Sequence, residues 1–398
     1  MTGDLAAQLL RRGYLALPHE HRQHGGADVF GSSVLGRRAV VVRGREGARL
    51  FYDTSVVERA GAIPAPLANL LFGRGAVHGT DGATHASRKR MFLDLLDEDR
   101  VADLATTIGR DLERRAAGWS GREVVVFDEL VEVYGAAVQA WAGIIAGPAQ
   151  TRRTSRRLAA VVDGFGGAGA AYPKAWLARW WIDRRARRLV AQARSGWPEA
   201  RPGSVVAELA TGPGAGLDAR LAGVELVNIL RPTVAVAWAG TFLARDLHAY
   251  PQWRALLDDP EHRVEFGHEV RRTCPFVPAL AGRAVRRAQI ADTTVEPGDL
   301  IVLDVPGTNR DPDHWAEAER FLPERFAGVM PDPFAFVPQG GGDPTTGHRC
   351  PGETLTVRIL SETARVLAGV DYEPVTDTAH DPTRIPTLPA RGLPVRVS

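Results

Sequence analysis

Residues 339–353 read Gln-Gly-Gly-Gly-Asp-Pro-Thr-Thr-Gly-His-Arg-Cys-Pro-Gly-Glu, and this stretch decides how the rest of the chain is interpreted. Its glycines let the backbone come close to a flat, bulky group. Pro351 suits the first turn of a helix, which places Cys350 at a helix N-terminus, where backbone N–H groups stabilise a thiolate. A structural cysteine is the alternative, but the glycines, His348 and Arg349 favour a metal ligand or a nucleophile.

Composition excludes several classes of protein. The chain has 398 residues, of which 44% are apolar and 24% charged, as in a globular protein with a large core. Its 49 Lys and Arg residues face 47 Asp and Glu residues, so the charge is too balanced for an electrostatic nucleic-acid binder. Only Cys274 and Cys350 are present, which excludes a disulfide scaffold, and Cys274 is expected to be a small buried hydrophobe.

The location expected from the sequence is cytoplasmic. Residues 1–14 have no long apolar run and no small-residue cleavage site, so no signal peptide is predicted. Residues 226–244 are about as long as a membrane span, but they contain Arg231 and Pro232. We therefore predict a buried helix there and no integral membrane segment.

The order of sequence patterns predicts a mainly α protein of the α+β class. No linker or internal repeat divides the chain, so residues 1–398 are expected to form one domain. Helices are predicted over residues 4–14, 46–52, 85–96, 100–119, 128–146, 175–194, 217–248 and 351–368. Strands are predicted over residues 39–43, 284–290 and 300–303. The long irregular passage over residues 306–344 is the anomaly, because such segments inside compact domains are usually functional.

A second group of residues precedes the cysteine stretch. Glu269 and Arg272 lie three apart on one helix face, and the run Pro-Glu-Arg-Phe over residues 323–326 supplies Arg325 to the same carboxylate. Alone, either would be a surface ion pair. In this order before Cys350 they resemble the Glu-x-x-Arg pair, the meander and the cysteine loop of the cytochrome P-450 superfamily. The resemblance implies the cytochrome P-450 fold, a helix-rich domain with small β-sheets and a central haem.

The resemblance also implies the cofactor, haem b (iron protoporphyrin IX), with the Cys350 thiolate as the axial ligand of iron. An electron-donating thiolate favours O–O bond cleavage. His85 and Lys89 match the superfamily's helix that holds the haem propionates, and Arg283 and His348 are further candidates. A solvated surface charge is the alternative for Lys89, Arg283 and His348.

Two departures narrow the family. Asp343 and Thr346 stand where the usual cysteine loop has Phe and Gly, and Arg231-Pro232 replaces the usual acid and alcohol of the central helix. Both departures resemble the bacterial fatty-acid peroxygenase group, which uses hydrogen peroxide to hydroxylate or decarboxylate fatty acids at the α or β carbon. The partners implied are a medium- or long-chain fatty acid and hydrogen peroxide, with no obligatory redox partner and no nucleic acid.

Arg231 is the residue expected to bind the substrate. It is the only charge within residues 226–244, so if buried it needs an anion, and a fatty-acid carboxylate fits a guanidinium. Pro232 removes a helix hydrogen bond to Asn228 and opens the backbone there. The bound carboxylate would then serve as general acid–base, and it would place the α and β carbons nearest the oxidant. An internal ion pair with a helix carboxylate is the alternative.

Other candidates surround this residue. His78 matches a distal position that is Gln in hydroxylating members and His in decarboxylating ones, so the resemblance favours a terminal alkene; an ordinary loop histidine is the alternative. Residues expected to line an acyl-chain tunnel, for which core packing is an equal alternative, are Leu70, Leu71, Phe72 and Phe165.

Arginine runs at residues 152–157 and 184–188, with Trp176, Trp180 and Trp181 nearby, could form a nucleic-acid face. The compensated net charge and the helical spacing favour a solvated helix face instead. Two other functions stay open for the whole chain. One is a monooxygenase that depends on a redox partner, and the other is a catalytically silent protein that binds haem or fatty acids.

Overall fold

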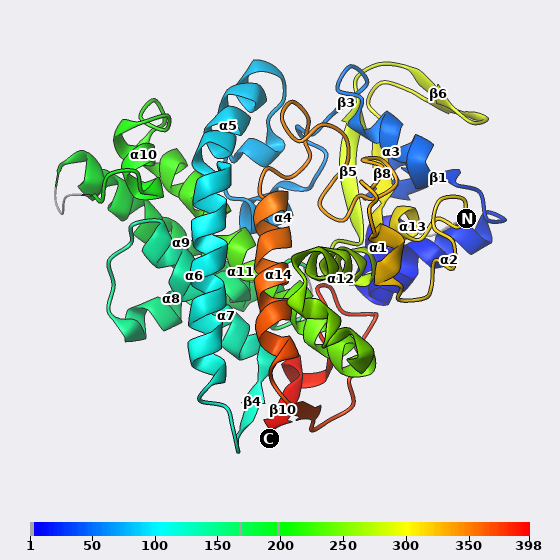
Figure 1. Cartoon of the computed structure of the whole chain (residues 1–398). Coiled ribbons are helices and arrows are strands. Elements are labelled where there is room, and N and C mark those ends of the chain that lie inside the picture. Colours follow the sequence, from blue (N-terminus) through cyan, green and yellow to red (C-terminus); the bar gives the residue numbers. More distant parts are fainter. Residues whose placement is uncertain (1–3, 167–168, 197–199) are drawn as a thin grey trace.

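The computed structural model describes residues 4–166, 169–196 and 200–398 (Figure 1). Helices fill the left and centre of the view, and the largest sheet lies at the upper right beside the N-terminal segment, which confirms a mainly α protein of the α+β class. The described α-helices are α1 (Leu5–Arg12), α2 (Ala16–Gln23), α3 (Gly44–Tyr52), α4 (Ala65–Leu71), α5 (Gly82–Leu95), α6 (Glu98–Ala116), α7 (Val126–Trp141), α8 (Pro148–Asp163), α9 (Ala171–Arg194), α10 (Val205–Thr211), α11 (Ala219–Ala249), α12 (Pro260–Thr273), α13 (Val305–Asn309) and α14 (Glu353–Ala368). The short 3-10 helices are η1 (Gly13–Leu15), η2 (Val77–Gly79), η3 (Pro251–Trp253), η4 (Leu256–Asp258), η5 (Pro323–Phe326) and η6 (Ala390–Gly392).

The strands form three small sheets. They are β1 (Val29–Val34), β2 (Arg37–Val42), β3 (Val57–Glu58), β4 (Glu123–Val125), β5 (Ala279–Ala284), β6 (Ala288–Ile290), β7 (Thr293–Val295), β8 (Leu300–Asp304), β9 (Tyr372–Pro374) and β10 (Pro394–Val397). The five-stranded sheet has the order β1-β2-β8-β5-β3, the second sheet the order β4-β10-β9, and β6 pairs with β7. All pairs are antiparallel except β2 with β8.

Strand β2 shows why the largest sheet is buried on both faces. Val40 and Val42 belong to one hydrophobic cluster, whereas Ala39 and Val41 belong to another. Because successive side chains of a strand point to opposite faces, an uninterrupted apolar run requires cover on both sides. The predicted strand over residues 39–43 is therefore confirmed, and it begins two residues earlier.

Helix α11 is the central helix of the fold. It packs against α7, α8, α9, α12 and α14. It is long and apolar enough to span a membrane, but 89% of its apolar window is buried within the protein. The side chain of Asp218 accepts a hydrogen bond from the Leu221 N–H at 2.8 Å and so caps the first turn. Pro232 lies inside the helix without ending it, so the predicted buried helix is confirmed.

The irregular passage predicted over residues 306–344 contains two short elements, the end of α13 and η5. The rest is ordered without regular structure because buried side chains bind its backbone. Arg272 of α12 donates to the carbonyl oxygens of Asn309, Ala318 and Arg320 at 2.8–3.0 Å. Carbonyl groups that would otherwise be unsatisfied are thereby paired.

Several predicted boundaries were wrong, including the following three. The helix over residues 128–146 ends at Trp141, before Gly143, whose φ of 84° is left-handed. The strand over residues 284–290 is the end of β5 followed by the separate strand β6. Helix α14 begins at Glu353 with Gly352 as its N-cap, so Pro351 precedes the helix instead of opening it.

Candidate active site

A fully buried carboxylate joins helix α12 to the passage that follows it. The two oxygens of Glu269 accept bidentate hydrogen bonds from Arg272 at 2.7 and 2.8 Å, and Arg325 lies 3.3 Å from the same carboxylate. The Leu322 N–H also donates to Glu269 at 2.8 Å. The structure thus brings together the three charged residues that the sequence selected, and Glu269 leaves neither arginine without a carboxylate.

A second ion network supports the cysteine loop, residues 339–350. Arg271 of α12 and Arg349 of the loop both bind the carboxylate of Glu353, the first residue of α14. The two guanidinium groups lower the pKa of Glu353 against the opposing effect of burial. Arg271 also donates to Gln339 Oε1 at 3.1 Å, and Gln339 Nε2 lies 3.9 Å from Cys350 Sγ. Sequence analysis missed Arg271 and Gln339, since neither belongs to a recognisable spacing.

The glycines of the cysteine loop approach another part of the protein. A Cβ atom on Gly340 would lie 2.7 Å from the Tyr52 hydroxyl oxygen, and one on Gly341 would lie 3.2 Å from the Tyr52 ring. Gly340 also has a φ of 99°, which strongly favours glycine. The close approach expected of these two glycines is therefore explained by Tyr52 at the end of α3.

The surroundings of Cys350 correct one expectation. Burial raises the pKa of the thiol, and it outweighs the Gly352 N–H and the cations of Lys89 and Arg271, which lower it. The helix start alone therefore does not make Cys350 a thiolate. A bound metal cation would, because coordination deprotonates a thiol outright.

Arg231 is a buried cation that forms no ion pair with any described residue. Its side chain is 7% exposed, and its Nε has no hydrogen-bond partner. Burial lowers its pKa to about 9, and the charge of Arg179 acts in the same direction, whereas Cys350 acts oppositely. The alternative of an internal ion pair with a helix carboxylate is wrong for the residues that the structure describes.

His78 lies beside this cation. Its ring stacks on Phe72 with centroids 4.2 Å apart, and the Arg231 guanidinium lies 5.7 Å from the centroid of the same Phe72 ring. Burial lowers the pKa of His78 to about 3, with further contributions from Arg231, His348 and other nearby cations. The imidazole is therefore neutral at ordinary pH.

We infer from their accessible surface and their pKa shifts that His78 and Cys350 border an internal space. Both side chains keep accessible surface, although desolvation shifts the pKa of each. Surface that is accessible but removed from bulk water must face an internal space. The charges of Arg231 and Cys350 also act on one another, so the buried cation belongs to the same region.

Sequence analysis missed two residues that bind the backbone beside Phe72 and His78. We call this part of the site the distal wall. Arg179 of α9 is fully buried and donates to the carbonyl oxygen of Leu71 at 3.2 Å, at the end of α4. Glu225 of α11 accepts from the Val77 N–H at 3.0 Å, next to His78. A signal was present for both, because each is a charge at a helical spacing that otherwise carries apolar core residues.

The predicted propionate partners fall into two groups. The rings of His85 and His348 are tilted by 33° with centroids 3.9 Å apart, and Lys89 donates to the carbonyl oxygens of Gly347 and Arg349 in the cysteine loop. Arg283, in contrast, is 36% exposed and pairs with a carboxylate of β3 at 3.1 Å. That contact matches the surface-charge alternative for Arg283, whereas the other three side chains belong to the cysteine loop or contact it.

Arg59 is a further cation of this region, and no pattern in the sequence identified it as a candidate. Its Nη1 is buried without a hydrogen-bond partner, and the guanidinium lies 3.8 Å from the centroid of the Phe51 ring. Its charge and that of His85 lower the pKa of His348 further than burial does alone. Asp81 partly compensates, since it lies 3.1 Å from His348 Nε2.

The predicted tunnel residues are placed less uniformly. Phe72 faces His78 and Arg231, as described above, and the neighbouring Leu71 is partly buried. Leu70 is fully buried, and Phe165 lies in the turn that follows α8. Among described residues, no recorded ring contact joins Phe165 to the Arg231 region.

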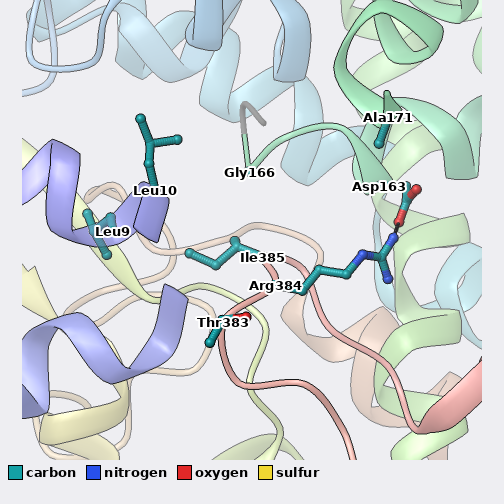
Figure 2. Close-up of a pocket in the computed structure, with 8 residues that line it drawn as sticks. All are labelled: Leu9, Leu10, Asp163, Gly166, Ala171, Thr383, Arg384 and Ile385. Carbon is teal, nitrogen blue, oxygen red and sulfur yellow. Dashed lines mark hydrogen bonds and ion pairs between the residues drawn. The ribbon is translucent and has the colours of Figure 1, made fainter. Parts of the chain in front are cut away.

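A separate hollow of about 90 Å³ lies near the junction of α8 and α9 (Figure 2). Figure 2 shows Leu9, Leu10 and Ile385 on one side and the ion pair of Asp163 with Arg384 on the other. None of its lining residues was predicted from the sequence as a site residue.

Comparisons with known proteins agree with this geometry. The sequence model described as Cytochrome P450 matches residues 266–360, which contain the Glu269 cluster and the cysteine loop. A solved structure of Cytochrome P450SP alpha (CYP152B1) is 36% identical, has a TM-score of 0.93, and matches 100% of this chain and 99% of its own. The chain belongs to the cytochrome P450 family.

Other known proteins are also similar to this P450. The ligand-free structure of cytochrome P450 OleT is 32% identical, has a TM-score of 0.93, and matches 99% of this chain and 97% of its own. Putative cytochrome P450 138 of Mycobacterium tuberculosis is 26% identical over 362 residues, which are 83% of this chain and 79% of that protein. A complex of Cytochrome P450SP alpha with (R)-ibuprofen and a complex of an OleT variant with arachidonic acid are also similar.

Membership of the family implies a cysteine-ligated haem, and the residues of this P450 fit such a group. Cys350 borders the internal space, and the loop that carries it is held by the buried ion pairs of Glu353. At the same interior, Arg59 Nη1 and Arg231 Nε are buried donors without partners. Buried donors normally have partners, so two orphaned cations indicate that anionic groups complete the site.

Proposed function

We propose that this chain is a haem-thiolate peroxygenase that oxidises medium- and long-chain fatty acids at the α or β carbon with hydrogen peroxide. The observation that carries the proposal is the unpaired, buried guanidinium of Arg231 in α11, which shares an interior with Cys350. The similarity to Cytochrome P450SP alpha and to OleT supports it, since one OleT structure contains arachidonic acid.

Haem b is the proposed cofactor, and the thiolate of Cys350 would hold its iron. When bound, it supplies an electron-rich iron at which the O–O bond of peroxide is cleaved. His85, Lys89 and His348 are proposed to hold the propionates by charge-assisted hydrogen bonds, whereas Arg283 already pairs with Glu58. Arg59 joins them because its orphaned Nη1 needs an anionic partner.

Arg231 is proposed to anchor the substrate carboxylate. A guanidinium donates two parallel hydrogen bonds to a carboxylate, which would satisfy the orphaned Nε and neutralise the buried charge. One carboxylate oxygen then takes the proton from hydrogen peroxide and returns it to the departing oxygen as water forms. Pro232 has no N–H, so it frees the Asn228 carbonyl and loosens α11 beside this anchor.

The anchor also explains the position of attack. A carboxylate fixed by Arg231 holds the α and β carbons closer to the reacting centre than any other part of the chain. The acyl chain is proposed to extend along Leu70, Leu71, Phe72 and Phe165. His78 stays neutral because its pKa is about 3, and we assign to it the choice between hydroxylation and decarboxylation to a terminal alkene.

The test is product analysis by mass spectrometry after hydrogen peroxide is added to the purified, haem-loaded protein with a series of fatty acids and no reductase. A terminal alkene supports both the peroxygenase and the role of His78. Hydroxy acids bearing the hydroxyl at the α or β carbon support the peroxygenase alone. No product with peroxide, but turnover with a ferredoxin and its reductase, replaces the proposal with a redox-partner-dependent monooxygenase.

Two variants complete this test. Cys350→Ser should abolish the thiolate spectrum of the ferrous carbon monoxide complex, and a normal thiolate spectrum in this variant would refute the axial ligand. If the wild-type protein binds haem and fatty acid but turns over with neither oxidant, the silent binding protein is the correct function. A cytoplasmic location stays a prediction that cell fractionation tests.

A further inference from the structure

Helices α8 and α9 carry a large excess of positive over negative charge. Together they hold eleven basic and two acidic residues. The rest of the chain carries 38 basic and 45 acidic residues, so the net charge of +2 conceals a strongly uneven distribution. The two helices pack side by side, and α9 buries its opposite face against α11.

The basic residues of these helices are largely unpaired. Both acidic residues are already bound, Asp163 by Arg384 and Asp183 by Arg179. Arg156 pairs with Glu132 of α7. Arg194 donates only to backbone carbonyl oxygens. The other arginines of α8 and α9 that form no ion pair within the described part of the chain are Arg152, Arg153, Arg157, Arg184, Arg185, Arg187 and Arg188.

Large apolar side chains lie among these arginines. Leu177, Trp180 and Trp181 are 65%, 56% and 42% exposed, and their spacing places them on one face of α9 with Arg184. The guanidinium of Arg157, from α8, lies 4.1 Å from the centroid of Trp181. These residues, with the unpaired arginines, form what we call the basic–aromatic face.

We propose that the basic–aromatic face docks the protein onto the surface of a bilayer that contains anionic lipids. Exposed tryptophans favour the headgroup level, where the ring is apolar and its N–H stays hydrated. Arginines lay their stems along apolar surface and keep the guanidinium at the phosphates. The sequence prediction of a merely solvated helix face is thereby revised.

Charge complementarity selects an anionic partner, and the exposed apolar side chains select a lipid one. A duplex nucleic acid would satisfy the arginines, but it would leave Leu177 exposed to water. A bilayer satisfies both, because each basic residue near an anionic surface adds about 1 kcal/mol of attraction, a factor of about five in binding, and Leu177 and the tryptophan rings enter the interface. Binding would be peripheral, since the one helix long enough to span is the buried α11.

The face also ends near the hollow of Figure 2. Ala171, the first residue of α9, lines that hollow, and Leu177 follows it by six residues, or roughly 9 Å of helix. Docking would therefore place the hollow close to the membrane. This arrangement does not depend on the proposed enzymatic function, since it concerns only surface charge and exposed apolar area.

The experiment is cosedimentation of the haem-loaded full chain with vesicles of phosphatidylcholine alone and of phosphatidylcholine mixed with phosphatidylglycerol. The expected result is binding to the anionic vesicles only, weakened by added salt, together with quenching of tryptophan fluorescence by acyl-brominated lipid. Arg184→Glu combined with Arg188→Glu should weaken binding by at least about tenfold. Leu177→Ser combined with Trp180→Ser should reduce both binding and quenching.

A matched control uses the other exposed apolar pair of the protein. Val329 and Met330 are more exposed than Trp180 but lie outside the face, so Val329→Ser combined with Met330→Ser should bind as the wild type does. An unchanged Soret band shows that each variant is folded. The proposal is overturned by equal binding to both vesicle types, by no binding, by unaltered binding of either face variant, or by tighter binding to random-sequence duplex DNA at the same salt.

Discussion

Buried arginines on the two sides of the internal space differ in whether they pair with a carboxylate. On the cysteine side, Arg272 and Arg325 share Glu269, and Arg271 and Arg349 share Glu353. On the distal side, Arg231 is equally removed from water and has neither a carboxylate nor a hydrogen bond to its Nε among described residues.

The difference separates charges that maintain the fold from a charge kept for a ligand. A buried ion pair with all its hydrogen bonds is neutral overall, and breaking it costs several kcal/mol. An unpaired buried cation destabilises the protein, and burial lowers the pKa of Arg231 to about 9 for that reason. Under the proposed function, the substrate carboxylate is the partner that offsets this cost.

The largest effect is expected at the buried Glu269 cluster, where both arginines are paired. Glu269→Gln leaves two buried guanidinium groups without a carboxylate, so we expect a loss of about 3–5 kcal/mol in the free energy of unfolding and little haem-loaded protein. Denaturant unfolding measures this loss. The control is Glu46→Gln, whose carboxylate pairs with Arg49 at an exposed site and should matter little. Similar stability of the two variants would contradict the structural role of Glu269.

Arg231→Met should produce the opposite combination of stability and activity. Removal of an unpaired buried charge is expected to raise the melting temperature, while fatty-acid turnover with peroxide falls by at least about a hundredfold. Arg220→Met, on the exposed start of the same helix, is the control for both measurements. A lower melting temperature with retained turnover would show that Arg231 is a structural residue.

A smaller effect is expected for Arg179, whose side chain binds the backbone of the distal wall. Arg179→Met leaves the carbonyl oxygens of Leu71 and Phe72 and the carboxylate of Asp183 without its hydrogen bonds. We expect a loss of about 1–3 kcal/mol in the free energy of unfolding, because these buried groups lose their hydrogen bonds. The spectral response to fatty acid should also be weaker, because the His78 ring stacks on Phe72. Haem binding should be unchanged. If the variant lost haem, Arg179 would belong with the arginines that support the cysteine loop.

The smallest effect concerns pH. The pKa of His78 is about 3 in the folded protein and near 6.5 when unfolded, so the unfolded chain takes up a proton that the folded one refuses. Stability should therefore fall as pH drops from 6.5 toward 3. His78→Gln removes this contribution, so its melting temperature relative to the wild type should rise with acidity over that window. A constant difference from pH 7 to 4.5 would mean that His78 titrates freely.

The sequence predicted the paired side of the site better than the open one. Glu269, Arg272 and Arg325 were found because short spacings on α12 and η5 determine their contacts. Arg231 was found because it is the only charge in an apolar run. Arg179, Glu225 and Arg59 depend on contacts between distant segments, such as α9 with the end of α4, which no local spacing reveals.

The same limit applies to the fold. Helices with strong periodicity, such as α6 and α11, were placed within a few residues of their ends. The strands β1, β3, β4, β7, β9 and β10 were not predicted. All of these except the six-residue β1 contain two to four residues and acquire their geometry only by pairing.

The parallel pairing of β2 with β8 also has a consequence for biosynthesis. Residues 39–42 pair with residues 300–303, so one edge of an apolar strand waits for a partner that is made roughly 260 residues later. At about 5–20 residues per second the ribosome needs on the order of 10–50 s to reach β8. During that interval β2 can pair only with β1, along its other edge. The nascent chain therefore carries an open strand edge of the kind that chaperones cover.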